Sequence, residues 1–245
     1  MPIIAFQHSD FGGLGRLGMT FRDHGFSISV RRPDLPTSKS NAGIPTDLDD
    51  VQGVIILGGP QNVTDIASLP WMQAQAAFIK EAHDAKLPVI GICLGAQLIA
   101  HCLGGTVAPR AKPAAGFRDT KVTIPGQTET MMAGIPWTSK LFYCCGQEIT
   151  QPPAGAMILA ANSDTKVQAF RVGIRTYAFM FHFEYDQNMM NADLNASRTI
   201  VEGAGLTQGE IKVQIDSDYA NAARIADRLC INLATYLFPA VARLV

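Results

Sequence analysis

Short apolar segments alternate with longer amphipathic ones over the first hundred or so residues, and this alternation constrains the fold more than any other feature. The apolar segments have the length of strands, and the segments between them have the spacing of helices. The expected strands are residues 2–6, 26–32, 53–59 and 88–93, and the expected helices are 15–25, 67–86 and 95–105. Apolar strands that alternate with helices are typical of a parallel sheet covered on both faces. We therefore predict an α/β fold with an open, mostly parallel sheet flanked by helices, as in flavodoxin-like proteins.

The second half of the chain has a different rhythm. Strand-like segments follow one another with turns such as "QPPAGA" between them, at 105–109, 121–124, 141–145, 157–162, 167–173 and 176–183. This succession predicts an antiparallel or mixed portion of the sheet. Residues 186–245 read as a C-terminal helical segment, most clearly at 219–241. We interpret 1–245 as a single domain, and 31–47 as a long loop of the kind that is often functional or mobile.

Composition and charge exclude several functional classes. The chain has 245 residues, of which 47% are hydrophobic and 17% charged, and its net charge is −1. It has no basic block for a nucleic acid, no apolar run long enough to span a membrane, and no signal-peptide pattern at its start. Its five cysteines form no C-x-x-C pair, which argues against a disulfide framework or a zinc site. We expect reduced thiols in a cytoplasm and neither metal nor cofactor.

The segment "PVIGICLGAQ" places a cysteine where the chain must turn from a strand to a helix. The pattern Gly91-x-Cys93-x-Gly95 is the thiol counterpart of the G-x-S-x-G nucleophile elbow. Glycines two residues before and after avoid a collision at the tight turn. Cys93 could instead be a buried structural cysteine, but the strand, the paired glycines and the helix together favour a nucleophile. The helix N-terminus and a nearby imidazole would give Cys93 alone among the thiols a lowered pKa, with Cys102 and Cys230 inert.

A second glycine turn, "VIILGGP", follows the preceding predicted strand. Adjacent parallel strands bring the loops that follow them side by side. Backbone N–H groups of Gly58 or Gly59, together with that of Leu94, could therefore form an oxyanion hole beside Cys93. An ordinary strand-to-helix turn is the alternative interpretation.

A cysteine nucleophile needs a base, and His182 is the best candidate. His8 is a weaker one at the end of the first strand, and the other histidines, His24, His83 and His101, lie in predicted helices. We expect His182 to end the strand 176–183, where Glu184 two residues later would share its face and orient the imidazole.

The segments "ILGGP", "GICLGAQLIAHCLGG" and "FHFE" together resemble the class I (triad-type) glutamine amidotransferases, in particular stand-alone proteins similar to the amidotransferase part of GMP synthase. The resemblance covers about Val54 to Asp186. It implies hydrolysis of the side-chain amide of glutamine, or of a glutamine-like amide, through a γ-glutamyl thioester. It also implies the triad Cys93, His182 and Glu184, the oxyanion donors Gly58, Gly59 and Leu94, and the substrate-binding residues Gln97, Gly146 and Gln147.

Three segments depart from the family pattern. Phe183 stands where the family usually has proline, "AAGF" lacks a glutamate common in relatives, and "YCCGQE" has Cys145 and Gln147 in place of His and Asp. Because the last segment helps relatives to hold the amino-acid end of the substrate, two other hypotheses stay open. The chain could be a cysteine hydrolase of γ-glutamyl compounds or peptides, or a non-catalytic binding or regulatory protein on the same fold.

A nucleotide-binding loop is not recognisable in the chain, since "GGLG" at 12–15 is too short to count as one. The resemblance therefore implies that a separate synthase chain accepts the ammonia. The chain alone would be a slow glutaminase.

Overall fold

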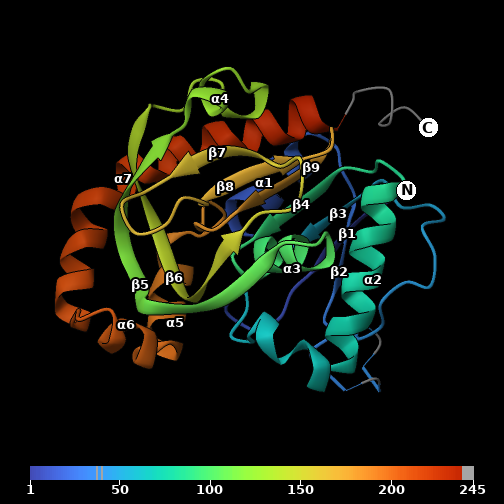
Figure 1. Cartoon of the computed structure of the whole chain (residues 1–245), viewed down its shortest axis with the longest axis horizontal. Helices are drawn as coiled ribbons and strands as arrows, with labels where there is room; N and C mark the ends of the chain where they lie inside the picture. The colour runs from blue at the N-terminus through green and yellow to red at the C-terminus, as the bar shows by residue number, and fades with distance from the viewer. Residues whose placement is uncertain (37, 40, 239–245) are drawn as a thin grey trace.

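The computed structural model describes residues 1–36, 38–39 and 41–238 (Figure 1). The strands are β1 Ile3–Phe6, β2 Ile28–Arg31, β3 Gly53–Ile56, β4 Val89–Ile92, β5 Thr106–Val122, β6 Thr138–Gln151, β7 Met157–Ala161, β8 Ala169–Val172 and β9 Thr176–Phe179. The α-helices are α1 Gly15–Asp23, α2 Pro70–Asp84, α3 Leu94–Cys102, α4 Ile124–Gln127, α5 Gln187–Ala196, α6 Arg198–Gly203 and α7 Gln208–Asn232. Two 3₁₀ turns, η1 Val63–Ser68 and η2 Thr130–Met132, and a π-helical turn, η3 Leu233–Leu237, complete the elements.

In the described part of the chain, nine strands form one sheet in the order β2-β1-β3-β4-β9-β8-β7-β5-β6. The strands β2, β1, β3, β4 and β9 are parallel to one another, and every neighbouring pair from β9 to β6 is antiparallel. The prediction of an α/β fold with a parallel first half and an antiparallel second portion is confirmed.

The hairpin of β5 and β6 differs most from the sequence prediction. The expected strands 105–109 and 121–124 are two ends of the single strand β5, and β6 extends well beyond the expected 141–145. Pro109 ends the first expected strand and Pro113 lies in the segment between the two ends, so the local sequence did not indicate one continuous strand. Pairing with β6 supplies its backbone partners, and a register shift between Pro109 and Ala114 accommodates the prolines.

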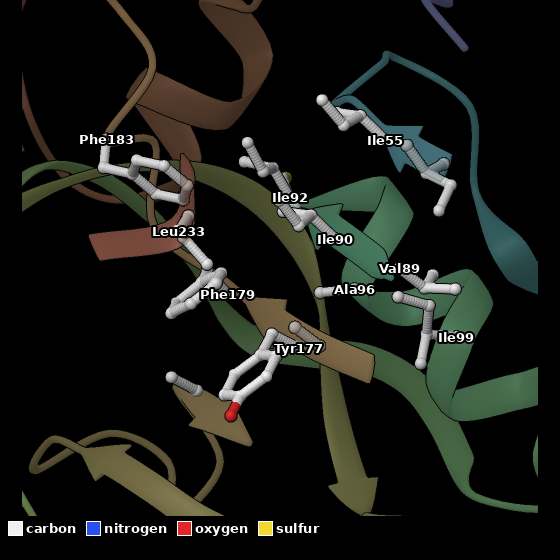
Figure 2. Packing of buried hydrophobic residues seen from close by; sticks show 14 of the residues in the cluster. Ile55, Val89, Ile90, Ile92, Ala96, Ile99, Tyr177, Phe179, Phe183 and Leu233 are labelled. Carbon is white, nitrogen blue, oxygen red and sulfur yellow. The ribbon is translucent and has the colours of Figure 1, made fainter. Parts of the chain in front are cut away.

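The parallel strands other than the edge strand β2, which is half-buried, are buried on both faces, as their continuous apolar runs predicted. All four residues of β1, β3, β4 and β9 are buried. Helices α2 and α3 pack against β3 and β4, while α1 packs against α7. Figure 2 shows Ala96 and Ile99 of α3 on one side of β4 and β9, and Leu233 and Phe183 on the other. The sheet thus holds the ends of β3, β4 and β9 in rigid, fully packed positions.

The C-terminal segment is helical, as predicted, but is divided into α5, α6 and α7 before the turn η3. Residues 239–241 of the expected helix, and residues 37 and 40 of the expected loop 31–47, lie outside the described residues. No helix within the described ranges combines the length and the apolar character needed to cross a membrane.

Candidate active site

Cys93 is the single residue between β4 and α3. Its backbone has φ 52° and ψ −105°, a conformation that residues other than glycine rarely adopt. A Cβ on Gly91 would lie 2.6 Å from the carbonyl oxygen of Gly95, and a Cβ on Gly95 would overlap the carbonyl oxygen of Ile56. The G-x-C-x-G segment therefore forms the strained turn that its spacing predicts, at the carboxyl edge of the parallel strands.

The order of the strands brings the distant parts of the site together. Strand β4 lies between β3 and β9 and is parallel to both. The segments that follow these strands, with Gly58, Cys93 and His182, therefore meet at one edge of the sheet. The backbone N–H of Cys93 donates to the carbonyl oxygen of Phe179, the last residue of β9, over 2.8 Å.

His182 and Glu184 form a buried pair. The Nδ1–H of His182 donates to Oε1 of Glu184 over 2.8 Å, and neither side chain is more than 2% exposed. The ring of Tyr185 stacks on the imidazole with 4.2 Å between ring centroids. The hydrogen bond and the stacking fix the orientation and the tautomer of His182, so that Nε2 carries the free lone pair.

The strand that precedes His182 is shorter than predicted. Strand β9 ends at Phe179, and residues 180–184 form bends rather than the expected extended segment. The backbone N–H of His182 donates to the carbonyl oxygen of Phe142 in β6, so the chain leaves β4 and pairs locally with the hairpin. The expected i, i+2 partnership of His182 and Glu184 is present, but it is made on a bend.

Two opposing effects act on the pKa of His182. Burial of the ring disfavours the charged imidazolium, while the charge and hydrogen bond of Glu184, with a smaller contribution from Asp193, favour it. The carboxylates prevail, and the pKa of His182 lies above its ordinary value.

The prediction that Cys93 has a lowered pKa is wrong for this structure. Burial removes the thiolate from water and raises the pKa of Cys93 well above its ordinary value, and the nearby Cys145 and Asp193 raise it further. Burial likewise raises the pKa of Cys102, Cys144 and Cys230, so the predicted inertness of Cys102 and Cys230 is supported. The raised pKa favours the neutral thiol of Cys93 at neutral pH.

The thiol and the imidazole flank the same glycine. A Cβ on Gly58 would lie 3.5 Å from Cβ of Cys93 and 3.6 Å from Nε2 of His182. In this structure Sγ of Cys93 faces the carbonyl oxygen of Cys144 at 3.8 Å. Nε2 of His182 is buried and has no hydrogen-bond partner among the described residues. An unpartnered nitrogen of His182 and a cysteine whose thiol makes only a long, weak contact with an acceptor thus both lie next to Gly58.

The carbonyl oxygen of Gly58 lies 3.4 Å from Nδ1 of His8, and Nε2 of His8 lies 3.0 Å from the side-chain oxygen of Gln75. Burial lowers the pKa of His8, so the ring is neutral and carries one N–H. Nε2 of Gln75 is buried without a hydrogen-bond partner in the described structure. With the oxygen and nitrogen of the Gln75 amide exchanged, its N–H donates to Nε2 of His8, and the Nδ1–H of His8 donates to the carbonyl oxygen of Gly58. Because a trans peptide directs its C=O and N–H to opposite sides, the N–H of Gly59 then points away from His8.

A pocket of about 280 Å³ opens over the thiol. Its size suits one small molecule. Seven of the nine residues that the sequence singled out line it: Gly59, Cys93, Leu94, Gln97, Gly146, Gln147 and His182. Glu184 is 0% exposed behind His182, and Gly58 lies between His182 and Cys93 without lining the pocket.

Gln147 is the predicted substrate contact with the least freedom. Its side-chain oxygen accepts from the backbone N–H of Val63 over 3.0 Å, and its nitrogen donates to the hydroxyl of Thr64 over 2.7 Å. The amide therefore ties β6 to the turn η1.

Sequence reasoning missed residues of the C-terminal segment. Tyr185, Asp193 and Ser197 line the pocket with Cys93. The available signal was an acidic residue on an otherwise apolar helix face, since Met190, Asp193 and Leu194 are the buried residues of α5. That signal shows burial but does not show what the buried carboxylate faces.

Gly15 of "GGLG" packs against the segment that carries His182 and Glu184. Gly15 has a φ of +43°, and a Cβ there would overlap the carbonyl oxygen of Glu184. The backbone N–H of Arg16 donates to that same oxygen over 2.8 Å. The start of α1 thus holds the segment that carries His182. Over the described ranges, no three His, Cys, Asp or Glu residues are grouped as metal ligands.

Comparisons with known proteins agree with this geometry. The family model described as glutamine amidotransferase class-I matches residues 14–199. A glutamine-hydrolyzing subunit of the GMP synthase of Saccharolobus solfataricus is 34% identical over 145 residues, which are 59% of this chain and 69% of that protein. The glutamine-hydrolyzing GMP synthase of Porphyromonas gingivalis is 32% identical over 144 residues, which are 58% of this chain and only 26% of that protein. The crystal structure of a glutamine amido transferase from Methylobacillus flagellatus has a TM-score of 0.83 and 25% identity, covering 94% of this chain and 93% of that one.

Proposed function

We propose, from the premise that the chain belongs to the class I glutamine amidotransferases, that Cys93, His182 and Glu184 hydrolyse the side-chain amide of glutamine in this pocket. The observation that carries the proposal is the buried His182–Glu184 pair, whose unpartnered Nε2 lies next to the same glycine, Gly58, as Cβ of Cys93 in the elbow. The pair supplies an oriented base, and the elbow supplies a nucleophile that needs one.

The proposed reaction has two halves. Cys93 gives its proton to Nε2 of His182 while Sγ attacks the amide carbon, and the imidazolium then protonates the leaving nitrogen, which departs as ammonia. In the second half, His182 takes a proton from water, and the resulting hydroxide attacks the γ-glutamyl thioester. Glutamate leaves, and the sulfur of Cys93 regains the proton.

The negative oxygen of each tetrahedral intermediate needs hydrogen-bond donors. Leu94 is the first residue of α3, and the first N–H groups of a helix have no partner within the helix. Gly59 lines the pocket beside it, and the hydrogen bond of His8 to Gly58 directs the N–H of Gly59 away from His8. We assign the oxyanion hole to the N–H groups of Leu94 and of the Gly58–Gly59 turn.

Electrophilic trapping tests the proposed chemistry. A chloroketone analogue of glutamine should alkylate Cys93, and excess glutamine should prevent the reaction, because both molecules would occupy the pocket beside the thiol. Mass spectrometry of peptides identifies the labelled cysteine. Labelling of Cys144 or Cys145 in place of Cys93 would contradict the assignment of the nucleophile.

A second candidate is a hydrolase of γ-glutamyl compounds or peptides. The engagement of the Gln147 amide with Val63 and Thr64 favours it, because this residue then offers less to the amino-acid end of glutamine. The chemistry at Cys93 would be the same, and only the leaving group would differ. Release of amines from γ-glutamyl peptides without release of ammonia from glutamine would select this candidate.

We propose that a separate synthase chain accepts the ammonia. The support is the relative from S. solfataricus, which is named as a subunit of a GMP synthase.

The pH dependence of Glu184→Gln provides a further prediction. The neutral form of His182 is the base, so kcat/KM should rise with pH through the raised pKa of this residue. Glu184→Gln removes the charge that favours imidazolium, so the acid limb should move to lower pH. The value of kcat/KM on the high-pH plateau should fall about tenfold or more, but by less than when Cys93 is replaced.

The pH profile of kcat/KM for wild type and Glu184→Gln measures both effects. Besides Glu184, the groups near the imidazole are the ring of Tyr185 and the carboxylate of Asp193, with Cys93 next to the same glycine, Gly58, and all three are retained in this variant. An acid limb at the same pH in both proteins would remove Glu184 from the triad.

A further inference from the structure

Asp193 is a carboxylate on a buried helix face, where burial of a charged group is unfavourable in free energy. It lies on the buried face of α5 with Met190 and Leu194, and it is only 5% exposed. It nevertheless lines the same pocket as Cys93. Burial raises the pKa of Asp193, because the charged form loses its hydration there.

The side chains next to Asp193 satisfy it only in part. The hydroxyl of Ser197 donates to Oδ1 over 2.9 Å, and Tyr185 and Cys144 offer further neutral donors. Among the described residues, the cationic group that acts on its pKa is the imidazole of His182, which already pairs with Glu184. A buried carboxylate normally has a cation as its partner.

The wall of the pocket lacks such a cation. Among the described residues that line it, none is lysine or arginine, and Asp193 is the only aspartate or glutamate. A site with one buried carboxylate and no fixed positive side chain is complementary to a ligand that brings the positive charge itself. The hydrogen bond from the hydroxyl of Ser197 satisfies one oxygen of Asp193 but does not explain the place of Asp193 in the pocket wall.

We propose that Asp193 binds the ammonium group of the substrate, so that this site accepts amides bearing a free amine and discriminates against amides that lack one. This inference rests on the proposed amide hydrolysis and adds the recognition of the substrate to it. Asp193 comes from the C-terminal helical segment, outside "YCCGQE", the segment expected to hold the amino-acid end.

The proposal has a consequence for the nucleophile. The negative charge of Asp193 adds to burial and to Cys145 in keeping Cys93 protonated. An ammonium group bound at Asp193 would neutralise this charge, so that substrate binding would favour proton transfer from Cys93 to His182. The thiol would then react less readily when the pocket holds no cation.

Protection of Cys93 from alkylation measures binding without requiring turnover. Two ligands are compared, L-glutamine and 4-carbamoylbutanoate, which has the same amide and carboxylate but no amine. The proteins are wild type, Asp193→Asn, Asp193→Glu and Asp216→Asn, which removes an exposed charge on α7 as a matched control. Each rate of iodoacetamide labelling at Cys93 is expressed relative to the same protein without ligand, and circular dichroism checks the fold.

In wild type, glutamine should protect Cys93 from iodoacetamide at a concentration about tenfold or more lower than the concentration of 4-carbamoylbutanoate that gives the same protection. This difference is expected for a charge-assisted contact. Asp193→Asn should abolish this difference, because it should weaken the binding of glutamine and leave the binding of 4-carbamoylbutanoate unchanged. Asp193→Glu should restore part of it, and Asp216→Asn should behave as wild type. Kinetically, Asp193→Asn should raise KM for glutamine more than it lowers kcat.

The outcomes separate this proposal from the proposed function. Equal protection of wild type by both ligands would overturn it, even if Asp193→Asn failed to fold. The proposal would also be overturned if glutamine protected Cys93 in Asp193→Asn as well as in wild type, or if glutamine did not protect Cys93 in wild type at all. Protection by glutamine that depends on Asp193, without release of ammonia, would retain the ammonium site and refute the amidase function.

Discussion

Cys93→Ser should lower kcat/KM for ammonia release by about 10,000-fold or more, because serine is a far weaker nucleophile in a site built for a thiol. The residue is the only one between β4 and α3, and its strained backbone presents the side chain beside His182. The exchange of sulfur for oxygen changes little volume, so the fold should persist. Steady-state assays of ammonia from glutamine, with circular dichroism as a check of folding, measure the effect.

Cys102→Ser is the matched control for this variant. Cys102 is the last residue of α3, and its thiol faces the carbonyl oxygen of Ile99 at 3.5 Å, away from the pocket wall. Its replacement should leave kcat/KM within about twofold of wild type. If Cys93→Ser retained activity comparable to that of Cys102→Ser, Cys93 would not be the nucleophile.

Gly95→Ala should destabilise the protein by about 3 kcal/mol. In a helix, exchange of glycine for alanine usually stabilises by about 1 kcal/mol, so propensity alone predicts the opposite sign. Here the added Cβ would overlap the carbonyl oxygen of Ile56, and neither that backbone nor the elbow can move without disturbing the packed sheet. The steric cost should therefore exceed the gain in propensity.

Urea unfolding of Gly95→Ala, compared with Gly43→Ala, tests this prediction. A Cβ on Gly43 would meet nothing within 4 Å, so that substitution should change the free energy of unfolding by less than about 0.5 kcal/mol. Gly95→Ala should also reduce activity, because β3 and the elbow cannot both keep their positions. A stability equal to that of Gly43→Ala would show that the close approach to Ile56 is not a constraint.

The nucleophile elbow was predictable because its determinants lie within a few residues. The strand, the two glycines and the helix that set the geometry of Cys93 are contiguous in the sequence, and the structure has the predicted turn. The pairing of His182 with Glu184 was also predictable from a spacing of two. The extent of the strand before them was not, because the exit at Phe179 depends on a hydrogen bond to Phe142 in a distant hairpin.

Charge and burial at the site were not predictable from local sequence. The turn and the helix N-terminus suggested a lowered pKa for Cys93, but the structure encloses the thiol between distant segments that carry Cys145 and Asp193. Asp193 itself reads as an ordinary residue of an amphipathic helix. Only the packing of α5 places its carboxylate in the pocket wall.

The sequence alone thus determined the alternating α/β architecture, the strained turn at Cys93 and the His182–Glu184 partnership, because each depends on periodicity or on short spacing. The tertiary structure decided the length of the β5–β6 hairpin, the neutral state of the resting thiol and the carboxylate that lines the pocket. These depend on which segments exclude water from one another, and that is set by contacts between residues far apart in the chain.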